Sequence, residues 1–179
     1  MEHRVVPHTF VADVAVIMND LRTNEDAVRS LIYGIIFGSP IPLILNPTSA
    51  ALSPERVLVA WNTSLPAARA IHAALPVLKA AKEVTLCVID PRARASADGQ
   101  DPGTGVATWL SHHGCNVTVQ QTPSGGKPNA DVILRCASET GADLVVMGAY
   151  GHSRMQQRVF GGTTRSMIEQ TGQAVLLAH

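Results

Sequence analysis

The chain has 179 residues with 14 basic and 14 acidic side chains, so its formal net charge is zero. Hydrophobic residues make up 46% of it, as in ordinary globular proteins. The absence of a basic stripe argues against a nucleic-acid partner, and no run reaches the roughly 18 apolar residues that a membrane span needs. Three scattered cysteines and an N-terminus without the apolar core of a signal peptide predict a cytoplasmic protein.

The first fifty residues predict a strand, a helix and a second strand. Residues 11–18 are mostly apolar and β-branched, which predicts a buried strand. Residues 24–36 predict a helix, because a cap residue and two acidic residues precede apolar residues at helical spacing. Residues 42–45 predict a short strand, and residues 46–49 a linker.

From residue 56 onward, strand patterns alternate with helix patterns. This alternation predicts an α/β fold, a doubly wound parallel five-stranded sheet with helices on both faces. Ligands of such sheets lie beyond the carboxyl ends of the strands, where the winding reverses. The predicted strands are 57–60, 84–89, 115–121, 144–147 and 174–178, and the predicted helices are 64–78, 105–113, 129–140 and a last one that begins near 161.

Glycines follow the predicted strand at 144–147 and lead to the last helix. Gly148 ends the apolar run, Gly151 follows three residues later, and Gly161 and Gly162 come next. Glycines let the backbone approach a ligand closely, and the N–H groups of a first helical turn have no intrahelical partner. A strand, a glycine loop and a helix N-terminus in succession therefore predict an anion site.

The spacing of these glycines resembles the nucleotide-binding signature of the universal stress protein family. The resemblance covers residues 56–179 and implies an adenine-nucleotide alpha-hydrolase-like fold. In the family, a Ser or Thr follows the last glycine directly and contacts phosphate. Gly162 stands in that place here, and Thr163 and Thr164 come next. Either Thr163 replaces the missing hydroxyl, or triphosphate binding is weak or lost.

The resemblance also implies the other residues around a nucleotide. Family members that bind nucleotide commonly carry an Asp at the exit of the first strand, where this chain has Asn62, which can form hydrogen bonds but has no charge. Plain packing remains the alternative for Ala60, Val88 and Met147, and helix capping remains the alternative for Thr163. The expected nucleotide-binding residues are Ala60, Asn62, Val88, Met147, Gly148, Gly151, His152, Gly161, Gly162, Thr163 and Thr164.

As a family member, the chain is expected to be a stress-response module that binds an adenine nucleotide, ATP or AMP, with little or no hydrolysis. Magnesium is expected only together with ATP, since the motif contains no carboxylate. We expect no catalytic residue and no metal site, because the adjacent His112 and His113 lack further Cys or His residues at zinc spacing. One alternative is a nucleotide-free dimerisation or scaffold module of the same fold, and another is an enzyme acting on a phosphorylated metabolite.

An internal similarity accounts for the N-terminal segment. Residues 12–18 parallel residues 142–148, and residues 42–45 parallel residues 174–177. Residues 1–50 are therefore expected to be a partial, degenerate universal stress repeat with β-α-β order, ahead of a complete domain at 56–179. An unrelated β-α-β arm is the alternative.

Two strands and one helix cannot bury a core alone, so the N-terminal segment is expected to dock. Universal stress proteins pair through their last strands. The resemblance therefore implies antiparallel pairing of residues 42–46 with 174–178, either within the chain as a pseudo-dimer or through the same strands in a homodimer.

Overall fold

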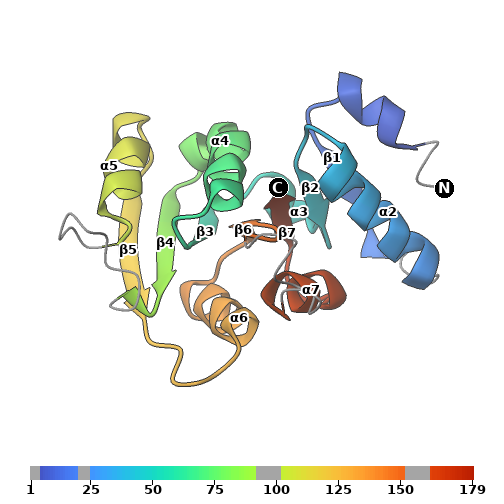
Figure 1. Ribbon diagram of the computed structural model, residues 1–179. Coiled ribbons are helices and arrows are strands. Elements are labelled where there is room, and N and C mark those ends of the chain that lie inside the picture. The colour runs from blue at the N-terminus through green and yellow to red at the C-terminus, as the bar shows by residue number, and fades with distance from the viewer. Residues whose placement is uncertain (1–4, 20–24, 92–101, 152–161) are drawn as a thin grey trace.

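Seven strands form one sheet among the residues that the computed structural model describes, which are 5–19, 25–91, 102–151 and 162–179 (Figure 1). Their order across the sheet is β1-β2-β7-β6-β3-β4-β5. The strands are β1 (Ala15–Ile17), β2 (Leu43–Leu45), β3 (Arg56–Trp61), β4 (Glu83–Ile89), β5 (Val117–Thr122), β6 (Leu144–Gly148) and β7 (Val175–Ala178).

The five strands from β3 to β7 run parallel, which confirms the predicted fold class. β3 lies in the middle of these five. The chain adds β4 and β5 on one side of it and then returns to place β6 and β7 on the other side. The winding therefore reverses between β3 and β6, where Ala60 pairs in register with Met147. In folds of this kind, this is the position where ligands bind.

Helices cover both faces of the sheet and enclose two apolar cores (Figure 1). One core lies under α3, α4 and α5, and the other lies under α2, α6 and α7. No helix among the described residues is long and apolar enough to cross a membrane. The helices are η1 (Val6–Val11, a 3-10 helix), α2 (Glu25–Gly38), α3 (Ser49–Leu52), α4 (Leu65–Ala80), α5 (Thr104–His112), α6 (Asn129–Thr140) and α7 (Gly162–Glu169).

The N-terminal segment joins the same sheet through β2. β1 and β2 are parallel, whereas β2 is antiparallel to β7, with Ile44 opposite Leu176 at the centre of the pairing. This confirms the predicted pairing of residues 42–46 with 174–178 within the chain. Asn46, the first residue of the predicted linker, adds hydrogen bonds to this junction. It is 1% exposed, and its amide donates to the carbonyls of Gln170 at 2.8 Å and Gln173 at 3.1 Å.

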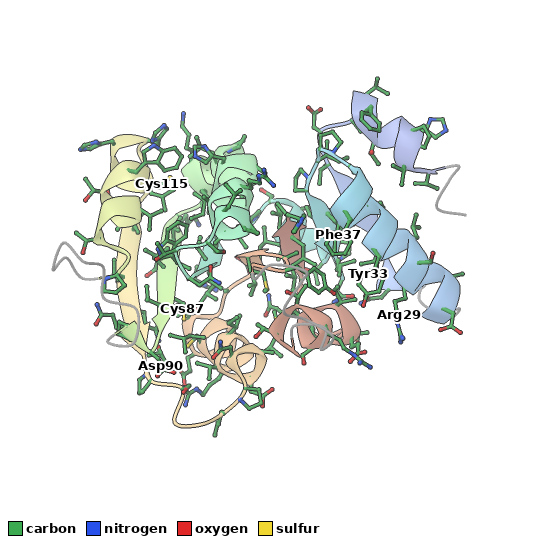
Figure 2. All side chains as sticks on the ribbon, viewed as in Figure 1. Arg29, Tyr33, Phe37, Cys87, Asp90 and Cys115 are labelled. Atoms are coloured by element: carbon green, nitrogen blue, oxygen red, sulfur yellow. The ribbon has the colours of Figure 1, made fainter. Side chains whose placement is uncertain are left out.

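Aromatic side chains form a second contact between the N-terminal segment and the rest of the protein. Tyr33 and Phe37 project from α2 toward the C-terminal half of the sheet (Figure 2). The ring of Phe37 lies 5.1 Å from that of Tyr150, just after β6, and 4.9 Å from that of His179, just after β7. The docking expected of the N-terminal segment is therefore present in both its strands and its helix.

The prediction of a buried strand over residues 11–18 was wrong in its bounds and in its burial. Only Ala15–Ile17 form a strand, and Val11 belongs to η1 and is 90% exposed. Val14 and Val16 are 40% and 41% exposed, because β1 is the outermost strand of the sheet and this face of it is open across the described residues.

The short helix α3 was not predicted; the Thr48 hydroxyl caps it by accepting the N–H of Ala51.

Candidate functional site

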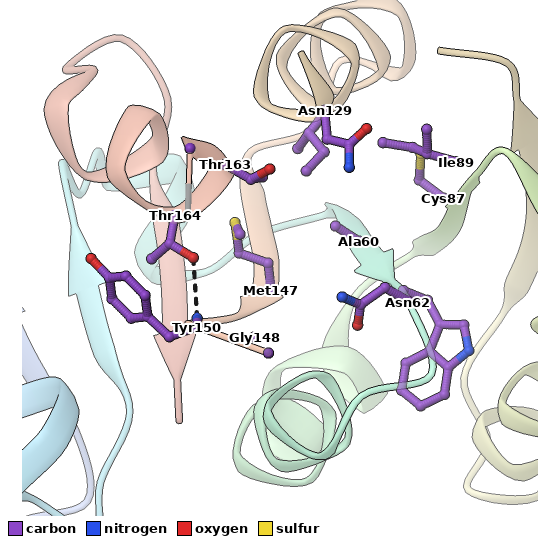
Figure 3. A pocket seen from close by; sticks show the side chains of 14 residues that line it. Ala60, Asn62, Cys87, Ile89, Asn129, Met147, Gly148, Tyr150, Thr163 and Thr164 are labelled. Atoms are coloured by element: carbon purple, nitrogen blue, oxygen red, sulfur yellow. Dashed lines mark hydrogen bonds between the residues drawn. The ribbon is translucent and has the colours of Figure 1, made fainter. Parts of the chain in front are cut away.

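A cavity of about 210 Å³ lies at the carboxyl ends of β3, β4 and β6, beside the start of α7 (Figure 3). It occupies the point where the winding of the sheet reverses. Its lining comprises Ala60, Trp61, Asn62, Cys87, Ile89, Asn129, Ile133, Met147, Gly148, Tyr150, Gly151, Gly162, Thr163 and Thr164.

Most of the residues predicted from the sequence therefore meet in one place. Val88 does not line the cavity: it packs with Leu86 near Gly103, on the opposite face of β4. Cys87 and Ile89 face the cavity instead, because successive side chains of a strand point to opposite faces. His152 and Gly161 lie outside the described residues.

The inner part of the cavity is apolar. Ala60 and Met147 lie side by side in β3 and β6, and Cys87 and Ile89 continue the same wall from β4. Burial, reinforced by the neighbouring Cys136 thiol, raises the pKa of Cys87 to about 12. Cys87 is therefore a neutral, weakly reactive thiol at physiological pH, and this wall suits an uncharged flat group.

Asn62 contributes a hydrogen-bond donor at the mouth of the cavity. Its Oδ1 accepts the hydroxyl of Ser64 at 2.6 Å, and Ser64 in turn accepts the N–H of Ala67 as the cap of α4. The Ser64 bond occupies the amide oxygen, so the NH₂ group of Asn62 faces the cavity (Figure 3). Asn62 thus offers donors to a ligand where an Asp would offer only acceptors.

The motif glycines have different structural roles. A Cβ built on Gly148 would lie 2.4 Å from the backbone nitrogen of Ala67, so Gly148 is needed because α4 begins directly against it. A Cβ on Gly151 would lie 3.0 Å from the hydroxyl oxygen of Ser64, whereas a Cβ on Gly162 would meet nothing within 4 Å. Gly148 and Gly151 therefore allow the exits of β3 and β6 to lie close together. Of the three motif glycines that the structure describes, only Gly162 has free space around its Cα.

The two threonines of α7 also differ. Thr164 is 5% exposed, and its Oγ1 accepts the N–H of Tyr150 at 3.1 Å, which ties the loop after β6 to the helix. Thr163 is half-buried, and its hydroxyl points across the cavity toward Asn129 (Figure 3). Because α7 begins at Gly162, Thr163 lies inside the first turn and is not the cap. The N–H groups of this turn have no intrahelical partner, which suits them to an anion.

None of the side chains that line the cavity in the described part of the chain carries a charge at neutral pH. Burial and the neighbouring Tyr33 raise the pKa of Tyr150, so this phenol is also neutral. Within the described ranges, no group of three or more His, Cys, Asp or Glu side chains could hold a metal ion. An anion in this cavity would therefore meet helix N–H groups and hydroxyls from the described residues.

Several lining residues were not among the predicted site residues. Asn129 and Ile133 lie one turn apart on α6, a helix that the sequence predicted with the observed bounds. Their spacing of four residues, which places both side chains on the face of α6 toward the sheet, was the sequence signal that could have identified them. Tyr150 has a φ of 56°, an uncommon conformation for this residue type, and no sequence pattern indicates it. Trp61 was interpreted as packing, and it also lines the cavity.

The universal stress protein family matches residues 54–179, well over half of the chain. The chain belongs to this family. Its structure is similar to that of a universal stress protein from Archaeoglobus fulgidus DSM 4304, with a TM-score of 0.68 and 20% identity, over 99% of this chain and 64% of that one. It thus spans less than two thirds of that relative. No curated protein matches the sequence.

Two further structures share the fold. A functionally unknown protein from Pseudomonas aeruginosa PAO1 has a TM-score of 0.63 and 16% identity, over 99% of this chain and 67% of that one. A universal stress protein in complex with cAMP has a TM-score of 0.50 and 17% identity, over 70% of this chain and 97% of that one. At these identities the likeness concerns the fold.

Proposed function

We propose that this universal stress protein is a stress-response module that binds an adenine nucleotide, ATP or AMP, with little or no hydrolysis. The observation that carries the proposal is the cavity at the winding reversal, which joins an apolar slot to the first turn of α7. A nucleotide needs these two environments at opposite ends. The cAMP complex of a protein with the same fold is consistent with this ligand class.

In the proposed complex, the adenine ring lies in the slot beside Ala60 and Met147, and the Asn62 amide donates to the base or ribose. The phosphates lie at the first turn of α7, against the N–H groups of that turn and the Thr163 hydroxyl. His152 and Gly161 stay proposed ligands outside the described residues. Magnesium would accompany ATP only, bound chiefly by the phosphates.

The proposal favours binding over turnover because of the chemistry of the lining. The described lining residues include no carboxylate and no histidine, which are the usual general bases. The one thiol among them, Cys87, has a raised pKa. These residues can hold and orient a nucleotide, but they offer no group to activate water.

A hydroxyl deletion tests the phosphate contact. In Thr163→Val, AMP should bind about tenfold more weakly, which corresponds to one charge-assisted hydrogen bond of about 1.5 kcal/mol. Adenosine, which has no phosphate, should bind equally to variant and wild type. Thr118→Val, at an exposed position of β5, is the matched control and should change neither affinity. Isothermal titration calorimetry measures all six affinities, those of AMP and adenosine for the wild type and the two variants.

The second candidate function is the nucleotide-free dimerisation or scaffold module. It is favoured by the size of the cavity, because about 210 Å³ is below the roughly 300–1,000 Å³ of ordinary ligand pockets. The presence of Gly162 where the family has a Ser or Thr hydroxyl also favours the scaffold function. If neither ATP, AMP nor cAMP raises the melting temperature at millimolar concentration, the scaffold function replaces the binder.

We also infer that residues 1–50 are a truncated universal stress repeat ahead of a complete domain at 56–179. Three observations support this. The β1-α2-β2 order repeats the β6-α7-β7 order, α2 and α7 pack into the same apolar core, and the last strands of the two units pair antiparallel. A local twofold axis between β2 and β7 would produce all three features.

A further inference from the structure

The face of β1 turned away from α2 is exposed and apolar. Val16 on this face is 41% exposed, and Val14 and Met18, which directly flank the strand at alternate positions, are 40% and 48% exposed. Ile17 on the other face is 4% exposed and packs in the core. We refer to these three side chains as the β1 face. β1 is also the last strand of the sheet, so among the described residues its outer edge has no strand beside it.

The corresponding strand of the complete domain shows what is different about this face. By the internal similarity, Val14 and Val16 correspond to Leu144 and Val146 of β6, which are both 0% exposed and belong to the core under α4. β6 also has β3 along the edge that corresponds to the open edge of β1. The β1 face is thus a surface that this fold normally covers.

A helix placed like α4 cannot cover the β1 face. Such a helix begins directly against Gly148, where a Cβ would lie 2.4 Å from the backbone nitrogen of Ala67. The residue that corresponds to Gly148 is Met18, whose long side chain would occupy that space. A partner of β1 is therefore expected at the outer edge of the strand, where Met18 does not obstruct it.

We propose that a second copy of this chain pairs with the outer edge of β1, its own β1 antiparallel to the first about a twofold axis at Val16, so that the two β1 faces lie side by side. The residues around Val16 are self-complementary for this pairing. Val14 falls opposite Met18 of the second copy, and Ala15 falls opposite Ile17, so both faces of the pair are apolar.

The protein already uses this kind of junction once. β2 and β7 meet antiparallel with apolar residues in register, and they join two strand-helix-strand units into one continuous sheet. Pairing of β1 with its copy would extend the sheet across two chains in the same way and remove its exposed edge. This proposal is independent of nucleotide binding.

A charge on the β1 face should separate the two copies. The wild-type chain should sediment as a dimer in analytical ultracentrifugation, and Val16→Lys should sediment as a monomer, because lysine on an edge strand opposes pairing. Val119→Lys is the matched control: Val119 is 40% exposed and lies on β5, at the other edge of the sheet, so this variant should stay dimeric. Circular dichroism verifies that both variants are folded.

Three outcomes overturn the proposal: a wild-type monomer at every soluble concentration, a Val16→Lys variant that stays dimeric, and dissociation of the Val119→Lys control. The last would mean that added charge at either edge is enough, so the effect would not be specific to β1.

Cysteine cross-linking tests the register itself. Val16→Cys should form an interchain disulfide on oxidation, because directly opposite residues of an antiparallel pair have Cα atoms about 4.5–5.5 Å apart, within disulfide reach. Val14→Cys should not cross-link with itself, since two residue steps on each strand separate the pair by about 13 Å. A mixture of Val14→Cys and Met18→Cys should cross-link. The native cysteines Cys87, Cys115 and Cys136 are buried and should not interfere.

Non-reducing gel electrophoresis reads out the cross-linking. Efficient Val14→Cys homodimers, or none from Val16→Cys while the wild type is dimeric, would contradict the twofold at Val16.

Discussion

Two strand-helix-strand units lie on either side of the β2–β7 junction, and they differ in what surrounds them. The C-terminal unit, β6-α7-β7, lies against β3 and α4 and helps to form the cavity. The N-terminal unit, β1-α2-β2, has the same order of elements, but among the described residues no strand pairs with the outer edge of β1. The N-terminal unit thus has the same strand-helix-strand order, but within the described ranges it lacks the neighbouring elements that form the cavity beside the C-terminal unit.

The difference between Gly148 and Met18 explains one part of the glycine signature. Both residues stand at the end of the apolar run of a strand, and the start of α4 lies directly against Gly148. The packing of α4 therefore requires the glycine, whereas Met18 stands where the described part of the chain has no helix that corresponds to α4. A strand-exit glycine in this family can thus indicate a packed helix as well as a nucleotide.

The largest expected effect comes from adding a single methyl group at this position. Gly148→Ala should destabilise the protein by about 3 kcal/mol, because the Cβ overlaps the backbone of α4, which cannot move without shifting the helix. Gly162→Ala is the matched control and should stabilise by about 0.5 kcal/mol, since its Cβ meets nothing and alanine suits a helix. Urea unfolding followed by circular dichroism measures both. Equal stabilities would remove the contrast between the two glycines.

The junction between the units depends on Asn46. Asn46→Ala should cost about 2 kcal/mol, because it removes a buried amide that donates to the half-buried carbonyls of Gln170 and Gln173. The matched control is Asn116→Ala, which removes an exposed amide that donates to the carbonyl of Lys82 and should cost less than about 0.5 kcal/mol. Chemical denaturation of the two variants compares them. If the Asn116→Ala control is destabilised as much as Asn46→Ala, the burial of Asn46 adds nothing to the stability that its hydrogen bonds provide.

The smallest expected effect concerns the aromatic contact between the units. Phe37→Ala should destabilise by about 1 kcal/mol, because it removes ring contacts with Tyr150 and His179. Leu52→Ala, at a leucine that is 65% exposed on α3, should change stability very little. Thermal unfolding of both variants measures the difference. If Phe37→Ala unfolds like the control, α2 contributes little to the cohesion of the two units.

The sequence predicted the parts of the fold in which periodicity reflects burial. The helix at 129–140 and the strand at 84–89 were located to within one residue, because apolar spacing separates the two periods clearly. The strand at 11–18 was overextended, since β-branched composition cannot reveal whether a neighbour covers a face. β4 is buried on both faces, so its sequence does not alternate, and it could not show that Cys87 and Ile89, rather than Val88, face the cavity.

The junction of β2 with β7 also has a thermodynamic consequence. An edge-to-edge contact between separate subunits obeys mass action, so it weakens as the protein is diluted. Here both strands belong to one covalent chain, and the effective concentration of one for the other is set by the connecting polypeptide. The association of the two strands therefore does not depend on the concentration of the protein.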